Sequence, residues 1–503
     1  RTNQPYFLFV LLSSQRVTSH NDEEEKESER KPQTRSNRTG MTEEDKKSTD
    51  VGSPEKPLPV DRQWIRKLLR KDGRPDEEPP IVLAPMVDQS DLPFRLLCRD
   101  YGVNLCFTPM VHAKLFMNNT EYRRKFTLEN SPARDRPLIA QICGSDIENV
   151  VPTAKILEPY CDGIDINCGC PQKIAKRGQY GAYLLEQPDV LLPVVRALVA
   201  AVRVPVSVKV RLLPAELGKE NMEEKVSAQS LEKAEDACVG PDCMTVPPEY
   251  QPCVETSLHL YRQLVDAGVH MLTIHGRTRH QKGPYTSQAD WKAIRQVVDE
   301  LGDRIPILAN GGIACAQDAR DCLEQTGCDG IMSSEGLLEY PPLLQSLVAS
   351  DPPLPSVRVG RLELARRYLE YARQYPPHVG GQGNAVKCLR VHIHRFCHAD
   401  LQDESEMGRS FRDAVVCETT LEGLVRIVKD IQAWHDEQGH DVQTEELSWY
   451  RRHSELNENG VYVNVMARRR AQDMAAKASE PVDDSEACFA GFFGGNEDDE
   501  DGW

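Results

Sequence analysis

GIDINCGCPQKIAKRGQYGAYLLEQPDVLLPVVRALVAAVRVPVSVKV, residues 163–210, is the stretch that decides the fold. It opens with a short apolar run, Gly163–Asn167. A segment with the apolar spacing of a helix follows at Val190–Val202, and a second apolar run follows at Pro205–Val210. A buried strand, a helix and another buried strand in this order are typical of the βαβ unit of a parallel sheet.

The same alternation continues in both directions, from about residue 80 to about residue 350. Further helical patterns lie at Asn149–Leu157, Leu258–Ala267 and Trp291–Leu301. Eight strand-helix units over roughly 270 residues predict an α/β fold of the (β/α)8 TIM barrel type. A doubly wound sheet is the alternative, but no G-x-G-x-x-G motif opens a helix. The eight apolar runs are Ile81–Pro85, Leu105–Pro109, Leu138–Cys143, Gly163–Asn167, Pro205–Val210, Met271–His275, Ile305–Asn310 and Gly330–Ser333.

Composition changes along the chain predict its domains. We expect the barrel to occupy residues 78–352 and to carry an acidic surface insertion at residues 213–253, helical around Glu223–Glu235. A smaller all-α domain is expected at residues 356–440, because three segments there have helical periodicity. The termini, residues 1–56 and 478–503, are polar and charged and lack hydrophobic periodicity, so we expect disorder. The three helical segments are Val357–Tyr375, Ala385–Ala399 and Thr420–Trp434.

The overall composition excludes some classes of protein. The chain has 503 residues, 40% of them hydrophobic, which is enough for a sizeable core. It lacks a run of 18 apolar residues, so we expect no membrane span. Its 16 cysteines show neither a disulfide framework nor a convincing zinc pattern, which favours free thiols in a reducing compartment and no bound metal. Tyr6–Leu12 could be part of a signal peptide, but no small-residue cleavage site clearly follows, and Met41 is a candidate initiator.

Taken alone, the net charge of −17 argues against an RNA-binding protein. Its distribution removes much of the objection. Residues 214–253 carry nine acidic residues and three lysines, and residues 478–503 carry nine acidic and no basic residues. In contrast, residues 357–400 carry eight Lys or Arg against three acidic residues. A local basic face therefore remains possible in the folded part of the chain.

Polar residues stand at the end of most predicted strands. In a TIM barrel the carboxyl ends of the strands build the active site. One such polar residue is more often a satisfied structural group, but six at one topological level indicate a site. These strand ends are Pro85-Met86, Gln141, Asn167-Cys168, Lys209 to Arg211, His275 and Asn310-Gly311-Gly312.

The ordered motifs resemble those of the tRNA-dihydrouridine synthase family. The resemblance is strong over residues 80–350, weak in the helical region, and interrupted by the insertion. It is closest to the eukaryotic branch that modifies positions 16 and 17 of the D-loop, as Asp88-Gln89-Ser90 and Gly283-Pro284 suggest. The motifs in order are Ala84 to Gln89, Pro93-Phe94-Arg95, Asp165 to Gln172, Ala175 to Gly178, Val208 to Arg211, His275 to Thr278, and Asn310-Gly311-Gly312.

The resemblance implies FMN as the cofactor and NADPH or NADH as the electron donor. The protein must then bind, orient and tune the flavin. Gln141 can donate to and accept from the pyrimidine edge of the flavin, and Lys209 would place a cation where charge accumulates on reduction. Glycines would let backbone N–H groups approach the phosphate. The cofactor-binding set is Pro85, Met86, Val87, Gln141, Lys209, His275, Asn310, Gly311, Gly312, Glu335 and Gly336.

Cys170 is the predicted catalytic residue. A thiol with a pKa of about 8.5 is mostly protonated at neutral pH and can protonate C5 of a uracil ring after hydride addition at C6. It lies between Gly169 and Pro171 on a loop beyond the fourth strand, which suits a mobile lid. In the family pattern the catalytic thiol directly precedes proline, which selects Cys170 over Cys168. We expect Cys168 to be a packed core residue.

Several basic residues are predicted to bind substrate. Arg211 is expected at the uracil oxygens or the cofactor phosphate. Lys387, Arg390, His394 and Arg395 have helical spacing and would form one exposed stripe that grips tRNA, although a solvated basic face is the simpler interpretation. The predicted substrate set is Arg211, Arg277, Lys176, Arg177, Lys387, Arg390 and Arg395.

The sequence therefore predicts a monomeric, cytoplasmic or also nuclear enzyme that reduces uridine in tRNA, without metal or membrane partners. Two alternatives stay open at this point. One is an FMN barrel reductase of a small pyrimidine or enone, against which the basic helical region argues. The other is a non-catalytic tRNA-binding protein on a decayed barrel, against which the intact Cys170, Lys209 and His275 argue.

Overall fold

The computed structural model describes residues 64, 79–129, 131–219, 248–282, 286, 288–347, 359–377, 386–439, 450, 454–456 and 462–464. The chain divides into Arg1–Glu55 and Lys56–Trp503, and every described residue belongs to the second unit. Several predictions lie outside the described residues: the N-terminal extension 1–56, the helix around Glu223–Glu235, Gly283-Pro284, and the tail 478–503.

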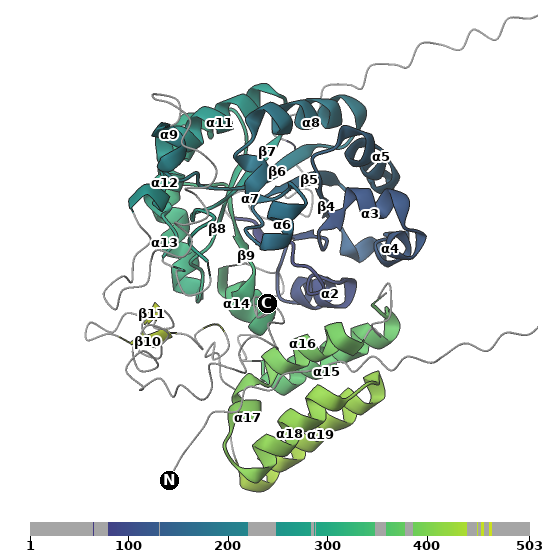
Figure 1. The fold of residues 1–503 in the computed structure, drawn as a ribbon. Coiled ribbons are helices and arrows are strands. Elements are labelled where there is room, and N and C mark those ends of the chain that lie inside the picture. The colour runs from purple at the N-terminus through teal and green to yellow at the C-terminus, as the bar shows by residue number, and fades with distance from the viewer. Residues whose placement is uncertain are drawn as a thin grey trace, which may run out of the picture. The chain divides into compact units, whose positions relative to one another are not determined.

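Eight parallel strands of the described chain close into a barrel, which confirms the predicted TIM fold (Figure 1). The ring closes because β1 pairs with both β2 and β9, and β2 also pairs with β4. A two-residue strand, β3 at Val111–His112, extends the edge of β4. The barrel strands are β1 Ile81–Leu83, β2 Leu105–Phe107, β4 Leu138–Cys143, β5 Gly163–Cys168, β6 Val206–Arg211, β7 Met271–His275, β8 Ile307–Asn310 and β9 Gly330–Ser333.

Each of the eight predicted apolar runs overlaps one of these strands. The differences lie at the ends, and several involve proline. β1 and β2 end before Pro85 and Pro109, and β6 begins after Pro205. Proline has no N–H group to donate to a neighbouring strand, so an apolar run that includes it overestimates the strand.

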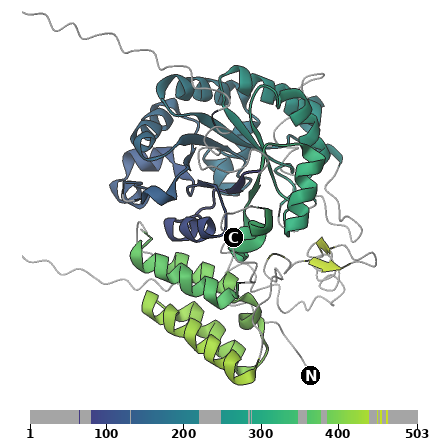
Figure 2. The same cartoon turned by 180° about the vertical axis from the view of Figure 1, so that it is seen from behind.

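Helices surround the strand ring, as both views show (Figures 1 and 2). α12 illustrates the local cause. The Asp290 carboxylate accepts a hydrogen bond from the Ala293 N–H at 2.8 Å and caps the helix, while Ala293, Ile294, Val297 and Leu301 face the core. The barrel helices are α2 Leu92–Asp100, α3 Ala113–Asn118, α4 Thr120–Lys125, α5 Ile147–Leu157, α6 Lys173–Arg177, α7 Ala182–Leu185, α8 Pro188–Ala201, α9 Glu216–Lys219, α11 Val254–Asp266, α12 Trp291–Leu301, α13 Ala316–Thr326 and α14 Glu335–Glu339, with short 3-10 turns at Ala133–Asp135, Glu158–Tyr160, Pro248–Tyr250 and Pro341–Leu347.

Five helices of the described chain follow the barrel, and three of them match the predicted helical segments. α17 and α18 were not predicted. α18 buries only Gly408, Phe411 and Val415, so its apolar pattern is too sparse to be read from sequence. The helices are α15 Arg361–Gln374, α16 Val386–Phe396, α17 His398–Gln402, α18 Glu406–Cys417 and α19 Leu421–Gln438; a short antiparallel pair, β10 Ser454–Leu456 and β11 Tyr462–Asn464, follows.

Polar contacts join the first of these helices to the barrel. α15 packs against α2. The Tyr368 hydroxyl donates to the Asp91 carboxylate at 3.1 Å, and one turn later the Tyr371 hydroxyl donates to Asp100 at 2.7 Å. Buried Arg361 lies 3.3 Å from the Glu339 carboxylate of α14. The helical region is therefore held to the barrel by specific contacts.

Candidate active site

The barrel interior has an apolar floor and a polar mouth. Successive side chains of a strand point to opposite faces, so one in two points inward. The inward-facing apolar side chains form a separate cluster, against which Trp64 packs: Val82, Ala84, Leu105, Phe107, Ile139, Met271, Leu308 and Met332. The residues that continue this alternation toward the carboxyl ends of β4 to β8 are polar. Strand alternation thus carries the polar residues of these strands into the mouth.

Strand register brings the predicted strand-end residues to common levels. Arg211 is paired with His275, and His275 with Asn310. Lys209 is paired with Asn167 one level deeper. These residues therefore converge at the carboxyl end of the barrel, as the sequence predicted.

Buried positive charge dominates this mouth. Lys209 Nζ donates to Asn310 Oδ1 at 3.0 Å, and burial together with nearby Arg211 lowers the pKa of Lys209 to about 8. Burial and the charge of Arg277 lower the pKa of Arg211 to about 10. Burial also lowers the pKa of Arg277. Cations that depress one another's pKa in this way favour a bound anion.

His275 is a neutral member of the same cluster. Burial and the neighbouring cations Arg211, Arg277 and Lys209 hold its pKa well below the usual range. Its Nε2 lies 3.0 Å from Arg277 Nη1, so this nitrogen accepts from the guanidinium. The other ring nitrogen then carries the proton. The imidazole can therefore act as a hydrogen-bonding group at neutral pH without adding charge.

The turn after β8 brings bare backbone into the mouth. Gly311 has a φ of +102°, and a Cβ there would lie 2.8 Å from His275 Cδ2. Gly312 has a φ of +83°, and its Cβ would lie 3.2 Å from the Trp291 ring. Only glycine fits this backbone and these close approaches. The turn leaves room beside His275 and Arg277 for a ligand that approaches the main chain.

The other predicted cofactor residues occupy different surroundings. Pro85, Met86 and Val87 are half-buried directly after β1, and the Met86 N–H is 3.0 Å from the Ser90 hydroxyl. Glu335 is exposed at the start of α14. Gly336 is buried, and a Cβ there would lie 2.8 Å from the Leu343 side chain and 3.0 Å from the Ile313 carbonyl. Packing against these neighbours is thus one reason for glycine at 336.

Cys170 lies at this mouth on the loop after β5 and is half-buried. Burial raises the pKa of its thiol, so the sulfur keeps its proton at neutral pH. The Cys170 carbonyl accepts from the Ala182 N–H at 2.9 Å, and the Pro171 carbonyl accepts from Lys282 Nζ at 3.0 Å. Cys168, in contrast, is fully buried in the core, as the sequence predicted.

Arg211 braces this loop. Its Nε donates to the Gly169 carbonyl at 2.7 Å, and its Nη1 donates to the Thr278 carbonyl at 2.8 Å. The guanidinium thereby ties the loop after β5 to the loop after β7. These two N–H groups are engaged by the chain itself, and contact of Arg211 with the uracil oxygens or the cofactor phosphate stays a prediction.

Comparisons with known proteins agree with this geometry. The sequence profile of the dihydrouridine synthase (Dus) family matches residues 82–237 and 250–430. A mouse protein named as tRNA-dihydrouridine(16/17) synthase-like is 37% identical over 346 residues, which cover 69% of this chain and 60% of the mouse protein. A fission yeast (Schizosaccharomyces pombe) protein named as tRNA-dihydrouridine(16/17) synthase is 31% identical over 354 residues, covering 69% of this chain and 77% of that protein.

The chain belongs to the dihydrouridine synthase family. It spans less than two thirds of the mouse and rat relatives, 60% and 65% of their lengths.

The basic residues that were predicted to bind substrate do not form one set in this chain. Lys176 and Arg177 are exposed on α6, directly after the Cys170 loop. Arg277 lies instead in the mouth beside His275 and Gly311, apart from these exposed residues. At this position Arg277 can contact a ligand that is bound within the barrel.

The predicted basic stripe on α16 is wrong in part. Lys387 is exposed, but Arg390 donates to the Val416 carbonyl at the end of α18. Arg395 is only 5% exposed and belongs to the buried side chains of α16. α16 contacts α14, α15, α17, α18 and α19, and a helix surrounded in this way has more than one buried side. Helical spacing alone could not reveal this.

Sequence reasoning assigned no role to Asp165 and Ser207, and none beyond a strand-end position to Asn167. Asp165 is fully buried, and its carboxylate accepts from Gln141 Nε2 and from the Ser207 hydroxyl, each at 2.7 Å. A signal was present: Asp165 and Asn167 are two apart in an otherwise apolar run, so both had to face the barrel interior.

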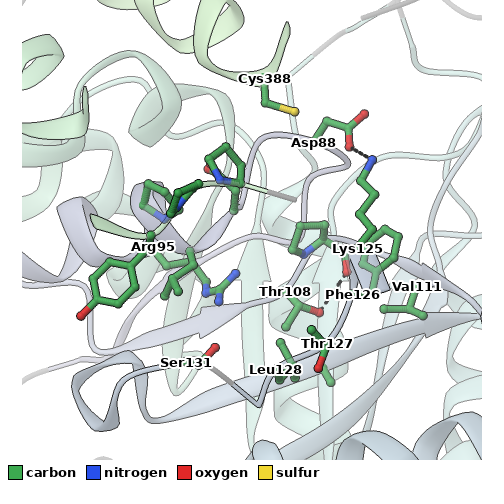
Figure 3. A pocket seen from close by; sticks show the side chains of 18 of the residues that line it. Asp88, Arg95, Thr108, Val111, Lys125, Phe126, Thr127, Leu128, Ser131 and Cys388 are labelled. Atoms are coloured by element: carbon green, nitrogen blue, oxygen red, sulfur yellow. Dashed lines mark hydrogen bonds and ion pairs between the residues drawn. The ribbon is translucent and has the colours of Figure 1, made fainter. Parts of the chain in front are cut away.

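A cavity of about 260 Å³ lies elsewhere, between the outer wall of the barrel and the helices that follow it (Figure 3). Thr108, Phe126 and Cys388 are among its lining residues, and the Lys125–Asp88 ion pair of 2.5 Å lies at one side. None of the predicted site residues lines it. This cavity is therefore separate from the predicted active-site residues at the barrel mouth.

Two further findings concern the described residues alone. Among them, no group of His, Cys, Asp or Glu side chains is arranged to hold a metal ion. No helix in the described ranges has the length and apolar character needed to cross a bilayer.

Proposed function

We propose that this chain is an FMN-dependent tRNA-dihydrouridine synthase that reduces the C5–C6 double bond of uridine at positions 16 and 17 of the tRNA D-loop. NADPH or NADH is the electron donor. The observation that carries the proposal is the position of Cys170, a protonated thiol at the mouth of a barrel lined with buried cations, in a chain of the dihydrouridine synthase family.

The residues of the mouth fit FMN. Arg277, beside the main chain of Gly311, suits a phosphate, because guanidinium and bare backbone N–H groups are both anion ligands. Lys209 suits the pyrimidine edge, where reduction places negative charge. The Gln141 amide donates one N–H to Asp165 and accepts one hydrogen bond from Asn167. An amide has a second N–H and a second lone pair, which can bind the flavin ring.

When bound, FMN supplies a hydride that derives from NAD(P)H. The residues of the chain handle the proton. Once C6 of uracil has accepted the hydride, C5 carries carbanion character and accepts the proton of the Cys170 thiol, which leaves a thiolate. Arg211 and Lys209 act electrostatically on this sulfur and favour its anion, and solvent returns the proton. The balance is one NAD(P)H and one proton consumed for each dihydrouridine.

The macromolecular partner in this proposal is tRNA, in the cytoplasm or also the nucleus. The names of the relatives support tRNA as the substrate. The exposed Lys176 and Arg177 of α6 lie close in sequence to Cys170 and could meet phosphates next to an extruded uridine. Lys387 offers a further contact on α16.

A direct test uses the purified full chain. The protein should be yellow, and released flavin should be FMN by chromatography. With NADPH, it should form dihydrouridine in tRNA lacking the modification, at positions 16 and 17 by primer extension. Reduction of free uridine without reduction of tRNA would contradict the proposal, and so would colourless protein that binds tRNA and cannot be reconstituted with FMN.

A further inference from the structure

A chain of buried hydrogen bonds runs from Asp165 to the Cys170 loop. Gln141 Nε2 donates to Asp165 Oδ2 at 2.7 Å, and Asn167 Nδ2 donates to Gln141 Oε1 at 2.8 Å. Asn167 Oδ1 then accepts from the backbone N–H groups of Gly169, at 3.2 Å, and Cys170, at 3.0 Å. Two amide side chains, one from β4 and one from β5, thus link a carboxylate inside the barrel to the main chain that carries the thiol.

The groups at the two ends of this hydrogen-bond network fix which atoms donate and which accept along it. An ionised carboxylate only accepts, so it requires the NH2 group of Gln141 to face it. Backbone N–H groups only donate, so they require the oxygen of Asn167. Between these ends the two amides can make all their contacts in one orientation only. Asp165 and Gln141 are fully buried, where a mismatched donor would be costly.

The charge of Asp165 has no salt-bridge partner among the described residues. Burial raises the pKa of Asp165 to about 6, while the Ser207 and Gln141 hydrogen bonds and the charge of Lys209 lower it. The carboxylate is therefore ionised at neutral pH, although it is buried. Keeping a buried charge has a free-energy cost that a structural Asn or Ser at this position would avoid.

We propose that Asp165 is a positioning residue for Cys170: its buried carboxylate orients Gln141 and Asn167, and Asn167 holds the main chain of the Cys170 loop. This inference rests on the proposed function for its kinetic consequence. Its structural consequence, the placement of the loop, does not depend on what the enzyme reduces.

The experiment compares three variants of the full-length holoprotein. Asp165→Leu removes both acceptor oxygens. Asp165→Asn keeps an acceptor for Gln141 but loses the charge, and charge-assisted hydrogen bonds are about twice as strong as neutral ones. Ser207→Ala is the matched control, because Ser207 donates to the other oxygen of the same carboxylate, the one that Gln141 does not contact.

The first readout is alkylation of Cys170 by iodoacetamide, followed by mass spectrometry of its peptide. Cys417, an exposed thiol on α18, is the internal reference. A loosened loop should expose the half-buried sulfur. We expect Cys170 in Asp165→Leu to react roughly fivefold faster, the factor for a lost hydrogen bond of about 1 kcal/mol. Asp165→Asn should show a smaller increase, and Ser207→Ala should react at the wild-type rate.

The second readout is dihydrouridine formation at saturating tRNA. We expect kcat to fall about 10- to 100-fold in Asp165→Leu, a range typical of groups that orient a functional side chain. The KM for tRNA should not change, and Asp165→Asn should restore most of the rate. Wild-type alkylation and kcat in Asp165→Leu would overturn the inference. Should that variant fail to fold, a wild-type alkylation rate in Asp165→Asn would overturn it.

The two proposals fail separately. A wild-type chain that makes no dihydrouridine, but whose Asp165 variants still change Cys170 alkylation, removes the proposed function and leaves the positioning role. An active chain whose Asp165 variants behave as the wild type in both readouts removes the positioning role alone.

Discussion

The proposed proton donation can be tested at a single residue, Cys170. Cys170→Ala should keep bound FMN and tRNA affinity but lose about two to four powers of ten in rate, the contribution of one general acid. Dihydrouridine in tRNA, quantified by mass spectrometry after single-turnover reactions, gives the measurement. Cys168→Ala is the control, because Cys168 is buried in the core and should cost stability alone. Full activity in Cys170→Ala would assign the proton to another group.

If Lys209 contacts the flavin as proposed, its protonation should make cofactor binding depend on pH. Burial lowers its pKa to about 8, so in the cofactor-free protein the side chain is an ammonium at pH 7 and mostly neutral at pH 9. After removal of flavin, FMN should rebind more tightly at pH 7 than at pH 9, as measured by quenching of flavin fluorescence. Lys209→Met should bind more weakly and lose most of this dependence. The same pH dependence in that variant would show that another group is responsible.

Alanine variants of Gly311 and Gly327 distinguish an effect on the proposed cofactor site from an effect of backbone strain alone. Both have positive φ, +102° and +62°, but Gly327 ends α13, away from the mouth. Alanine at either position should cost about 1–3 kcal/mol in the free energy of unfolding. Only Gly311→Ala should also release FMN, because its Cβ would lie 2.8 Å from His275. The ratio of flavin to protein absorbance after purification tests this, and equal ratios in the two variants would contradict it.

Among the elements, α6 and α16 carry the exposed cations that the proposed function assigns to tRNA binding. Lys176→Gln and Lys387→Gln should each weaken tRNA binding and lower the slope of log affinity against log salt by about one. Lys292→Gln, an exposed lysine on α12, serves as the control. Filter-binding titrations at several salt concentrations give the slopes.

A substitution of Arg395 tests whether this residue of α16 contacts tRNA or only packs against the neighbouring helices. It is 5% exposed, so Arg395→Gln should reduce thermal stability without changing the slope of affinity against salt. A reduced slope in Arg395→Gln, with stability unchanged, would show that the buried guanidinium reaches RNA after all.

The elements also show what the sequence could predict. Strands are short and buried on both faces, so continuous apolar runs located all eight, and register then followed from the closed ring. The partners of Arg211 and the burial of Arg395 could not be predicted in the same way. A long cationic side chain can extend toward solvent or toward a carbonyl, and for Arg211 the choice depends on Gly169 and Thr278, which lie 42 and 67 residues away in the chain.

At the scale of the whole molecule, the helices can grip tRNA usefully only if they are fixed on the barrel. The junction centres on Asp91, which accepts from the Tyr368 hydroxyl and lies 3.5 Å from Nε2 of the fully buried His392. His392 stacks on Phe94 of α2, with ring centres 4.5 Å apart. Residues from α15 and α16 thus meet the start of α2 in a buried polar contact, which makes the orientation of the helices specific.

Tyr368→Phe and Tyr371→Phe form a matched pair at this junction, because each removes one hydroxyl from α15. Tyr368 is fully buried and Tyr371 is half-buried, and burial holds the pKa of Tyr368 well above its usual range, so its hydroxyl stays a donor. Tyr368→Phe leaves the Asp91 carboxylate short of a donor inside the protein, which should cost about 1–3 kcal/mol in denaturant unfolding. Tyr371→Phe should cost less, because water can replace its hydroxyl. If the junction fixes the helices for tRNA, Tyr368→Phe should also raise the KM for tRNA while the flavin content stays constant. A larger loss in Tyr371→Phe would place the anchor at Asp100 instead.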